Sequence, residues 1–261
     1  MILNNIRLRL SYDGTQYSGW QRQKNAPTIQ GVLENKLSII TNNKVTVNGA
    51  GRTDAGVHAL DMVANFLTSS TMGPGEFIRA LNSMLPADIR ILDAQSMPRE
   101  FHARYQAIGK TYRYDFFTGR IQLPHERLYR THVRTDFSLN LVLPCLDLLL
   151  GSHDFSAFEA TGSRDTTRTG GRGAVRTLTR ADCLPAASDY FSFIFSGDGF
   201  LRHMVRNIAG TLFLVGAGKI NSQEFVSVLQ QKDRSLAGPT APPCGLFLQH
   251  VHYPSYMTKA P

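Results

Sequence analysis

The chain has 261 residues, 42% of them hydrophobic, which is enough for one large domain or two small ones with a sizeable core. Its three cysteines, Cys145, Cys183 and Cys244, are far apart and form no CxxC pair, which excludes a disulfide framework and a cysteine-rich zinc module. A net charge of +8 and a pI near 9.6 favour a polyanionic partner, nucleic acid first, although charge alone also fits a merely soluble basic protein.

The N-terminal residues alternate apolar and polar side chains and lack the apolar core of a signal peptide. No apolar run approaches the roughly 18 residues that a membrane span needs. We therefore expect a cytoplasmic protein without a membrane segment, in line with its reduced cysteines.

Alternation from Ile6 to Tyr12 predicts a first strand that ends at the turn Asp13–Gly14. Pro27 and Thr28 then begin a helix with an apolar stripe from residue 29 to residue 40. Strands are predicted at 45–48, 60–67 and 89–94, and a helix at 74–85 between prolines. The first part therefore has the order β-α-β-β-α-β of small α+β domains.

A long strand at 107–117 places Tyr112 and Tyr114 on one face. A helix follows at 140–150, where Pro144 is tolerable if Asn140 is the N-cap. Further strands are predicted at 175–182, 190–196 and 246–253, and helices at 203–215 and 222–231. The fold class is therefore α+β, with two halves of mixed or antiparallel sheets and helices, residues 1–105 and 106–261.

Residues 49–58 form the most informative stretch, because Gly49, Gly51 and Gly56 surround one Arg-Thr-Asp sequence. Glycines this dense indicate backbone that bends tightly or lies close to another segment. Predicted strands flank the stretch on both sides. Asp54 is then the side chain that a rigid loop would present.

Three other interpretations of this loop exist. A dinucleotide-binding fingerprint needs a third glycine at position 54 and a helix afterwards, and neither is present. A metal site could use Asp54, His58 and Asp61, but their spacing converges only on a helix. A solvated turn, in which Asp54 pairs with Arg52, is also possible.

Two basic segments are candidates for RNA contact. The loop at 17–24 places Trp20 beside Arg22, a mixture that can stack on bases and contact phosphates, or whose aromatic rings can simply cap the core. Arg164, Arg168 and Arg172 lie in a glycine-rich loop that is either a phosphate-contacting arm or a solvated segment.

Five motifs in order across almost the whole chain closely resemble the TruA family of tRNA pseudouridine synthases. They are Tyr12-Asp13-Gly14 through Gly19-Trp20-Gln21-Arg22-Gln23, Gly51 to His58, Phe101-His102-Ala103-Arg104, Tyr112-Arg113-Tyr114, and Met204-Val205-Arg206-Asn207. The glycine- and arginine-rich segment 161–173 departs from the family pattern, which puts the RNA contacts there in doubt.

The resemblance implies conversion of uridine to pseudouridine at positions 38, 39 and 40 in the anticodon stem-loop of tRNA, without a cofactor or a metal. It implies that Asp54 is the nucleophile, that Tyr112 stacks on the target base and that Arg206 pairs with the aspartate. It also implies a pseudouridine synthase fold with a catalytic cleft between the halves, and a homodimer in which one tRNA touches both subunits.

With these roles we group Arg52 among the catalytic residues and expect substrate contacts from a basic and aromatic set: Trp20, Arg22, His58, Arg104, Arg164 and Arg168. Two rivals from other classes are a non-catalytic RNA-binding module and a metal-dependent nuclease. A binder forms no modified nucleoside, and a nuclease shortens the RNA and stops with a chelator.

Overall fold

The computed structural model describes residues 3–163 and 172–257. The chain forms two compact units, residues 1–108 with 247–261, and residues 109–246. The predicted boundary between residues 105 and 106 lies close to the first junction of these units. The return of the chain to unit 1 at residue 247 has no counterpart in that prediction.

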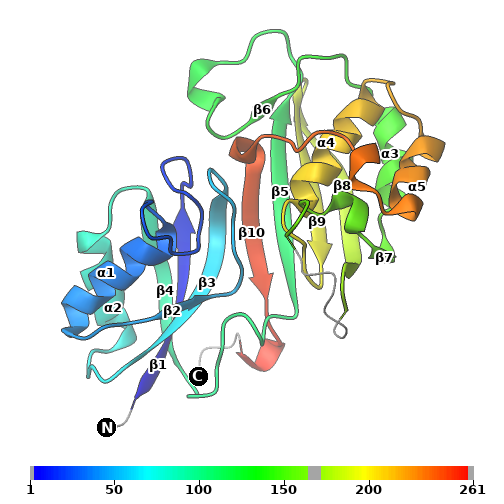
Figure 1. The fold of residues 1–261 in the computed structure, drawn as a ribbon. Coiled ribbons are helices and arrows are strands. Elements are labelled where there is room, and N and C mark those ends of the chain that lie inside the picture. Colours follow the sequence, from blue (N-terminus) through cyan, green and yellow to red (C-terminus); the bar gives the residue numbers. More distant parts are fainter. Residues whose placement is uncertain (1–2, 164–171, 258–261) are drawn as a thin grey trace. The chain divides into compact units, whose positions relative to one another are not determined.

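Unit 1 is a mixed sheet with two helices (Figure 1). Its strand order is β4-β1-β3-β10, and β2 pairs with residues 64–66 of β3. The elements in chain order are β1 (Asn4–Tyr12), α1 (Ile29–Thr41), β2 (Val47–Gly49), β3 (His58–Thr68), α2 (Pro74–Met84), β4 (Ile89–Met97) and, from the far end of the chain, β10 (Leu246–His252). The predicted order β-α-β-β-α-β is confirmed for residues 4–97.

The apolar alternation of β1 places its large side chains in the core of unit 1. Ile6, Leu8 and Leu10 are at most 1% exposed, and their strand runs antiparallel to both β3 and β4. Phe66 of β3 meets Phe77 of α2 edge to face, with ring centroids 5.3 Å apart. Such packing buries the apolar stripe of the helix against the sheet, which is its main source of stability.

Unit 1 gains its last strand from the C-terminal part of the chain. β10 runs parallel to β3, with Phe247 opposite His58 and Leu248 opposite Ala59. Parallel partners need a long connection, and here the connection contains α2, β4 and then the whole of unit 2. Close backbone contacts group residues 247–257 with unit 1.

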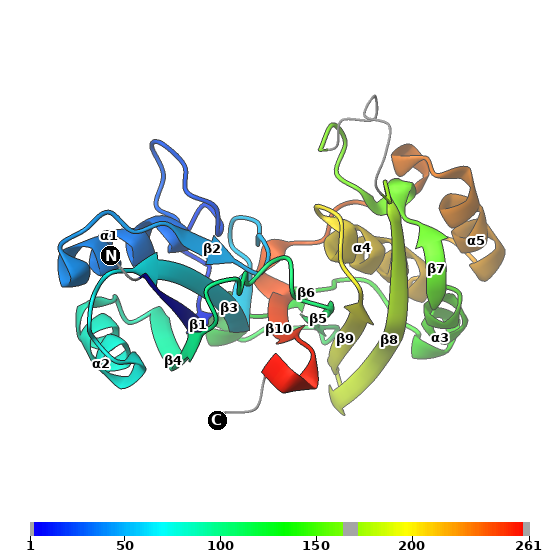
Figure 2. The same cartoon turned by 90° about the horizontal axis from the view of Figure 1, so that it is seen from below.

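Unit 2 also combines a mixed sheet with helices, which pack on one another and on the sheet (Figures 1 and 2). The strand order is β5-β9-β8-β7, all antiparallel, and the short β6 runs parallel to β5. Its elements are β5 (Gly109–Phe117), β6 (Thr131–His132), α3 (Leu139–Asp147), β7 (Gly151–Asp154), β8 (Val175–Ala187), β9 (Tyr190–Gly197), α4 (Met204–Gly216) and α5 (Ser222–Gln231).

An aromatic cluster forms the core of unit 2. Phe116 of β5 lies within 5.5 Å, ring centroid to ring centroid, of four other phenylalanines: Phe137, Phe191, Phe193 and Phe213. Aromatic rings bury the largest apolar areas of any side chain, so this cluster joins the sheet to α4 and to the segment before α3.

Three details of unit 2 differ from expectation. The N-cap of α3 is Ser138, so the prediction that Asn140 caps this helix was wrong, and Pro144 lies inside the helix. The backbone N–H of Ser138 is already held by the carbonyl of Gly216, which fixes the start of α3 earlier. The strands β6 and β7 have only two and four residues, which is too short for an alternating apolar pattern to be recognised in the sequence.

None of the helices in the described residues is long and apolar enough to cross a membrane.

We expect Asn65→Ala to destabilise unit 1. The Asn65 side chain, 2% exposed, accepts a hydrogen bond from Ala103 N (3.0 Å) and donates to Asn5 Oδ1 (3.0 Å) and Phe101 O (3.2 Å). Each buried polar group left unpaired costs about 1–3 kcal/mol. Urea unfolding followed by the fluorescence of Trp20, the only tryptophan, reports this unit.

Asn4→Ala is the matched control, because the amide of Asn4 makes its hydrogen bond to Ser70 O in an exposed position. We expect that change to stay within about 0.5 kcal/mol of wild type. Equal unfolding free energies for the two variants would contradict the structural role of Asn65.

Candidate active site

Asp54 lies in the loop that joins β2 to β3 in unit 1. Its carboxylate is neither fully buried nor fully exposed, and its backbone carbonyl accepts a hydrogen bond from Val57 N at 3.2 Å, which closes a tight turn. Rigid strands hold both ends of the loop, as predicted. The side chain is therefore presented from a turn whose backbone is fixed.

A second loop, residues 13–20 after β1, grips the Asp54 turn through backbone hydrogen bonds. Trp20 N donates to Thr53 O at 3.0 Å, and Gly56 N donates to Tyr17 O at 3.3 Å. The hydroxyl oxygen of Tyr12 lies 2.8 Å from that of Thr53. These bonds hold the residues on both sides of Asp54.

Two glycines make this close approach possible. A Cβ atom at Gly14 would collide with the carbonyl group of Val57. At Gly19 the backbone has φ +93°, a conformation that other residues rarely adopt, and a Cβ atom would lie 2.6 Å from Thr53 O. The glycines that admit the contact therefore belong to the 13–20 loop.

Trp20 belongs to the interior of this structure. Its side chain is 2% exposed, and its ring covers Gly49, where a Cβ atom would lie 2.5 Å from ring atoms. The expectation that Trp20 stacks on an RNA base is corrected, because a ring so deeply buried offers no face to a ligand. The other interpretation of that loop, an aromatic ring that caps the core, describes it.

His58 is likewise a packed residue, 2% exposed, whose ring stacks on Phe247 with centroids 4.7 Å apart. Its Nδ1 lies 3.1 Å from both Gly14 N and Asp13 Oδ1, but one ring nitrogen cannot accept from the first and donate to the second at once. Asp13 Oδ1 already accepts from Thr15 N and Oγ1, so we assign Nδ1 as the acceptor for Gly14. His58 thus supports the loop from within.

Asp61, the third residue of the metal interpretation, is engaged by two side chains, Arg9 and His250. Its two carboxylate oxygens lie 2.9 Å from Arg9 Nε and 2.7 Å from His250 Nδ1. In residues 3–163 and 172–257, no group of three or more His, Cys, Asp or Glu side chains is arranged to hold a metal ion.

The basic residues expected to contact substrate differ in their surroundings. Arg52 and Arg104 are exposed, whereas Arg22 lies 3.1 Å from Glu34 in an ion pair. Arg172 pairs with Asp198 at 2.6 Å. Arg164 and Arg168 lie outside the described residues.

Unit 2 carries the two other residues of interest. Tyr112 of β5 is 8% exposed and meets Phe200 edge to face, with ring centroids 4.9 Å apart.

Arg206 lies on the first turn of α4 away from the buried stripe, as predicted, and is half-buried. Its Nε donates to Ala241 O at 2.8 Å, and Ala241 N donates to Arg206 O at 3.1 Å. These hydrogen bonds with Ala241 fix the plane of the guanidinium.

Asn207, the next residue, anchors this region although its role has no signal in the sequence. It is completely buried; its Nδ2 donates to Phe158 O at 2.8 Å, and its Oδ1 accepts from Thr240 Oγ1 at 2.7 Å and from Arg234 Nη2 at 3.1 Å. Three segments distant in sequence thus meet at one amide. Only pairing of Asn207 with positions 158, 234 and 240 across related sequences could have revealed this.

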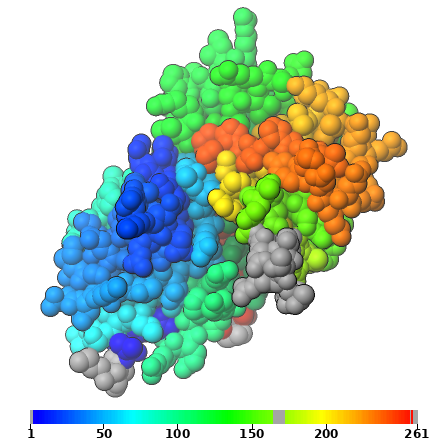
Figure 3. Space-filling view, viewed as in Figure 1, coloured from blue at the N-terminus to red at the C-terminus, as the bar shows by residue number. Residues whose placement is uncertain are grey.

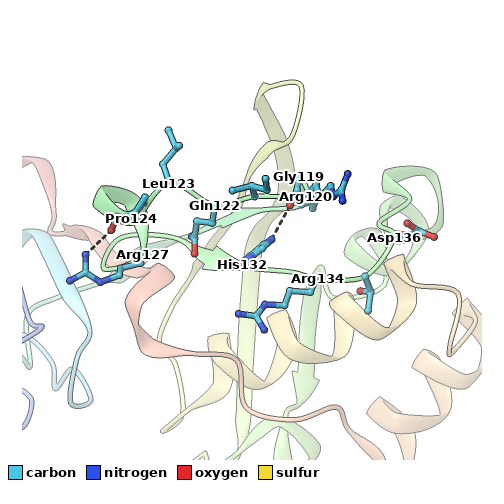
Figure 4. A pocket seen from close by; sticks show the side chains of 12 residues that line it. Gly119, Arg120, Gln122, Leu123, Pro124, Arg127, His132, Arg134 and Asp136 are labelled. Carbon is cyan, nitrogen blue, oxygen red and sulfur yellow. Dashed lines mark hydrogen bonds between the residues drawn. The ribbon is translucent and has the colours of Figure 1, made fainter.

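A cavity of about 900 Å³ lies at the end of β5 in unit 2, in the surface lobe that Figure 3 shows in green. Segment 118–136 lines it, with Arg120, Arg127 and Arg134 among its side chains. Figure 4 shows Arg127 turned towards Pro124 O and His132 towards Gly119 O, at 2.7 and 2.8 Å. None of the residues predicted for the active site lines this cavity.

This mixed sheet-and-helix architecture is that of a pseudouridine synthase fold. The pattern of the tRNA pseudouridine synthase family matches residues 10–106 and 146–254. The chain belongs to this family.

Individual relatives agree with this membership. The chain is 49% identical to tRNA pseudouridine synthase A 1 of Desulfotalea psychrophila over 96% of its length and all of the relative's. It is 43% identical to tRNA pseudouridine synthase A 2 of Clostridium tetani over 95% of its length and 98% of the relative's, and 43% identical to tRNA pseudouridine synthase A of Acetivibrio thermocellus over 96% and 100%.

We expect Gly19→Ala to destabilise unit 1, because alanine disfavours the backbone conformation at φ +93° and its Cβ meets Thr53 O. A strained backbone of this kind costs about 1–3 kcal/mol. Gly75→Ala, at an exposed position in the first turn of α2, should be neutral or stabilising by up to about 1 kcal/mol. Urea unfolding followed by Trp20 fluorescence compares them, and an unchanged midpoint for Gly19→Ala would contradict the close approach.

Proposed function

We propose that this protein converts uridine to pseudouridine at positions 38, 39 and 40 in the anticodon stem-loop of tRNA, with Asp54 as the nucleophile. The observation that carries the proposal is the Asp54 turn: a carboxylate presented from a backbone clamped by the 13–20 loop, in a member of the tRNA pseudouridine synthase family. The net charge of +8 suits a polyanionic substrate.

The chemistry requires a group that attacks and then leaves. Isomerisation breaks the bond between ribose C1′ and uracil N1 and joins C1′ to C5; the C5 proton leaves to solvent and N1 gains a proton, so the composition of the nucleotide is unchanged and no electron is transferred overall. A carboxylate can form a covalent intermediate with the sugar or the base and be released again. A fixed turn favours that attack, because a nucleophile held in place loses little freedom on reaching the transition state.

Tyr112 and Arg206 have supporting roles in this proposal. The flat Tyr112 ring would stack on the extruded uracil, and its edge-to-face contact with Phe200 keeps the ring in one orientation. Arg206 would pair with Asp54 and keep it ionised, since an opposite charge offsets the effect of desolvation on the pKa of a carboxyl. The hydrogen bond to Ala241 O supports this role, because it orients the guanidinium before substrate binds.

Five arginines complete the proposed substrate contacts. Arg52 lies two residues before Asp54 and is exposed, and we propose that it acts beside the nucleophile. Arg22, Arg104, Arg164 and Arg168 would contact phosphates, which position the RNA without reading its sequence. We further propose that the protein works as a cytoplasmic homodimer, as the family resemblance and the reduced cysteines suggest.

Asp54→Asn should abolish pseudouridine formation while folding and tRNA affinity remain nearly intact. The amide keeps the size and hydrogen-bonding capacity of the carboxylate but is no nucleophile. Phosphate contacts spread over a basic surface dominate affinity, and this change removes none of them. The measurement is tritium release from tRNA that carries 5-³H-uridine, beside filter binding and a thermal melt.

Asp93→Asn on β4 is the matched control, an acid-to-amide change in the same unit, and should keep wild-type activity. Mass spectrometry of the Asp54→Asn variant excludes deamidation of the introduced amide back to the carboxylate. If this variant binds and melts normally yet still releases tritium at even a few per cent of the wild-type rate, Asp54 is not the nucleophile.

Arg206→Gln should lower the single-turnover rate by orders of magnitude, because an unpaired, desolvated carboxyl tends to protonate and a protonated acid is a poor nucleophile. Arg206→Lys should restore little of the rate, since lysine lacks the planar fork that Ala241 O orients. Arg202→Gln, an exposed change before the same helix, is the control for charge. A near wild-type rate in Arg206→Gln would remove this residue from the mechanism.

A further inference from the structure

Tyr105 is an aromatic side chain that the fold leaves in solvent. It is 77% exposed, more than any other large apolar or aromatic side chain in the described residues. Trp20, the aromatic residue that the sequence suggested for base stacking, is 2% exposed. The exposed ring of unit 1 therefore lies elsewhere, in the segment between β4 and β5.

The backbone that carries Tyr105 is held rigidly by buried side chains. Asn5 Nδ2 donates to Phe101 O at 2.8 Å, and Asn65 Oδ1 accepts from Ala103 N at 3.0 Å. The Tyr253 hydroxyl donates to Ala103 O at 2.5 Å, and burial raises the pKa of that phenol, so it remains a donor. Residues from β1, β3 and the C-terminal segment thus hold the backbone at Phe101 and Ala103.

Local hydrogen bonds complete the support. Gln106 N donates to His102 O at 3.2 Å, and Gln106 Oε1 accepts from His102 N at 3.1 Å. Tyr105 lies inside this closed turn. A side chain so exposed on a backbone so constrained loses little conformational freedom when it binds a ligand, because the backbone is already ordered.

Two neighbouring side chains lie close to the Tyr105 ring. The His102 ring lies 4.2 Å away, centroid to centroid, at an interplanar angle of 33°, and the Arg104 guanidinium carbon lies 6.0 Å from the Tyr105 centroid. Burial and, after it, the charge of Arg104 lower the pKa of His102, so this ring is uncharged at neutral pH. At 77% exposure, most of the Tyr105 ring still faces solvent.

We propose that Tyr105 is a stacking site for an unpaired base of the tRNA substrate, a base other than the uridine that reacts. This proposal rests on the proposed function for the identity of the RNA. Charge complementarity supports an RNA ligand, because the exposed Arg104 lies beside the ring, Arg99 is exposed in the same segment, and phosphates flank every base. An aromatic face that stacks on a base while arginines contact the backbone is the usual way in which proteins bind unpaired RNA.

The fold separates this site from the nucleophile. The Asp54 turn leads into β3 at His58. Asn65, which holds the Tyr105 segment, lies seven residues further along the same strand. At about 3.3 Å per residue that is about 23 Å along the strand. At a rise of about 3.4 Å per nucleotide, such a separation corresponds to several nucleotides. Tyr105 therefore acts on binding and leaves the chemical step unchanged.

The test compares Tyr105→Ala, Tyr105→Leu and Tyr105→Phe with wild type on an unmodified tRNA transcript. Loss of one stacked base should weaken binding about 5- to 150-fold in the Ala variant. Leucine should restore little, because it offers no flat face, and phenylalanine should restore nearly all. KM should follow affinity in each variant, while the single-turnover rate at saturating tRNA stays at the wild-type value.

Ile39→Ala, which removes another exposed apolar side chain of unit 1, is the control and should bind like wild type. Tyr105→Trp gives a direct readout, since its fluorescence should be quenched by tRNA over the buried background of Trp20. If a thermal melt shows that the Ala variant is unfolded, the Phe and Trp variants test the proposal.

Three results would overturn the proposal: wild-type affinity in both Tyr105→Ala and Tyr105→Leu, a fall in the single-turnover rate at unchanged affinity, or a change in oligomeric state measured by light scattering. The last would make Tyr105 a contact between two copies of the chain. Failure of the proposed function is a separate outcome, because wild-type protein would then form no pseudouridine whatever the binding of the Tyr105 variants.

Discussion

Direct contact between two backbone segments is the constraint on which the candidate active site depends. The 13–20 loop lies against residues 53–57 so closely that a Cβ atom at Gly14 or Gly19 would meet main-chain atoms of the other segment. Hydrogen bonds to Thr53 O and from Gly56 N then fix the turn that presents Asp54. A carboxylate on this turn needs no reorganisation of the backbone before it can react.

Buried amides perform the same task for the irregular segments. Asn65 in unit 1 and Asn207 in unit 2 are almost completely inaccessible, and each satisfies backbone groups of a segment without regular structure. An asparagine offers both a donor and an acceptor, so one side chain can hold two chain segments. The side chains proposed to meet RNA, Tyr105 and Arg206, therefore stand on rigid supports.

Much of the positive charge is already paired within the protein. Arg22 pairs with Glu34, Arg172 with Asp198 and Arg180 with Asp182, so the net charge of +8 does not translate directly into phosphate contacts. Exposed ion pairs are worth little, about 0–1 kcal/mol, and can exchange for phosphates. Ordering of the RNA then depends on shape and stacking as well as on charge.

The sequence by itself determined the elements and the family. Alternation and capping signals are local, so the order of strands and helices in residues 4–97, the stripe of α4 and the loop around Asp54 followed from them. Burial decided what the sequence could not. Trp20 and His58 look like RNA contacts beside arginines and glycines, yet the close approach of two loops places them inside, while Tyr105 remains outside. The parallel pairing of β10 with β3 and the start of α3 at Ser138 depend on partners distant in the chain, and such long-range contacts leave no period in a single sequence.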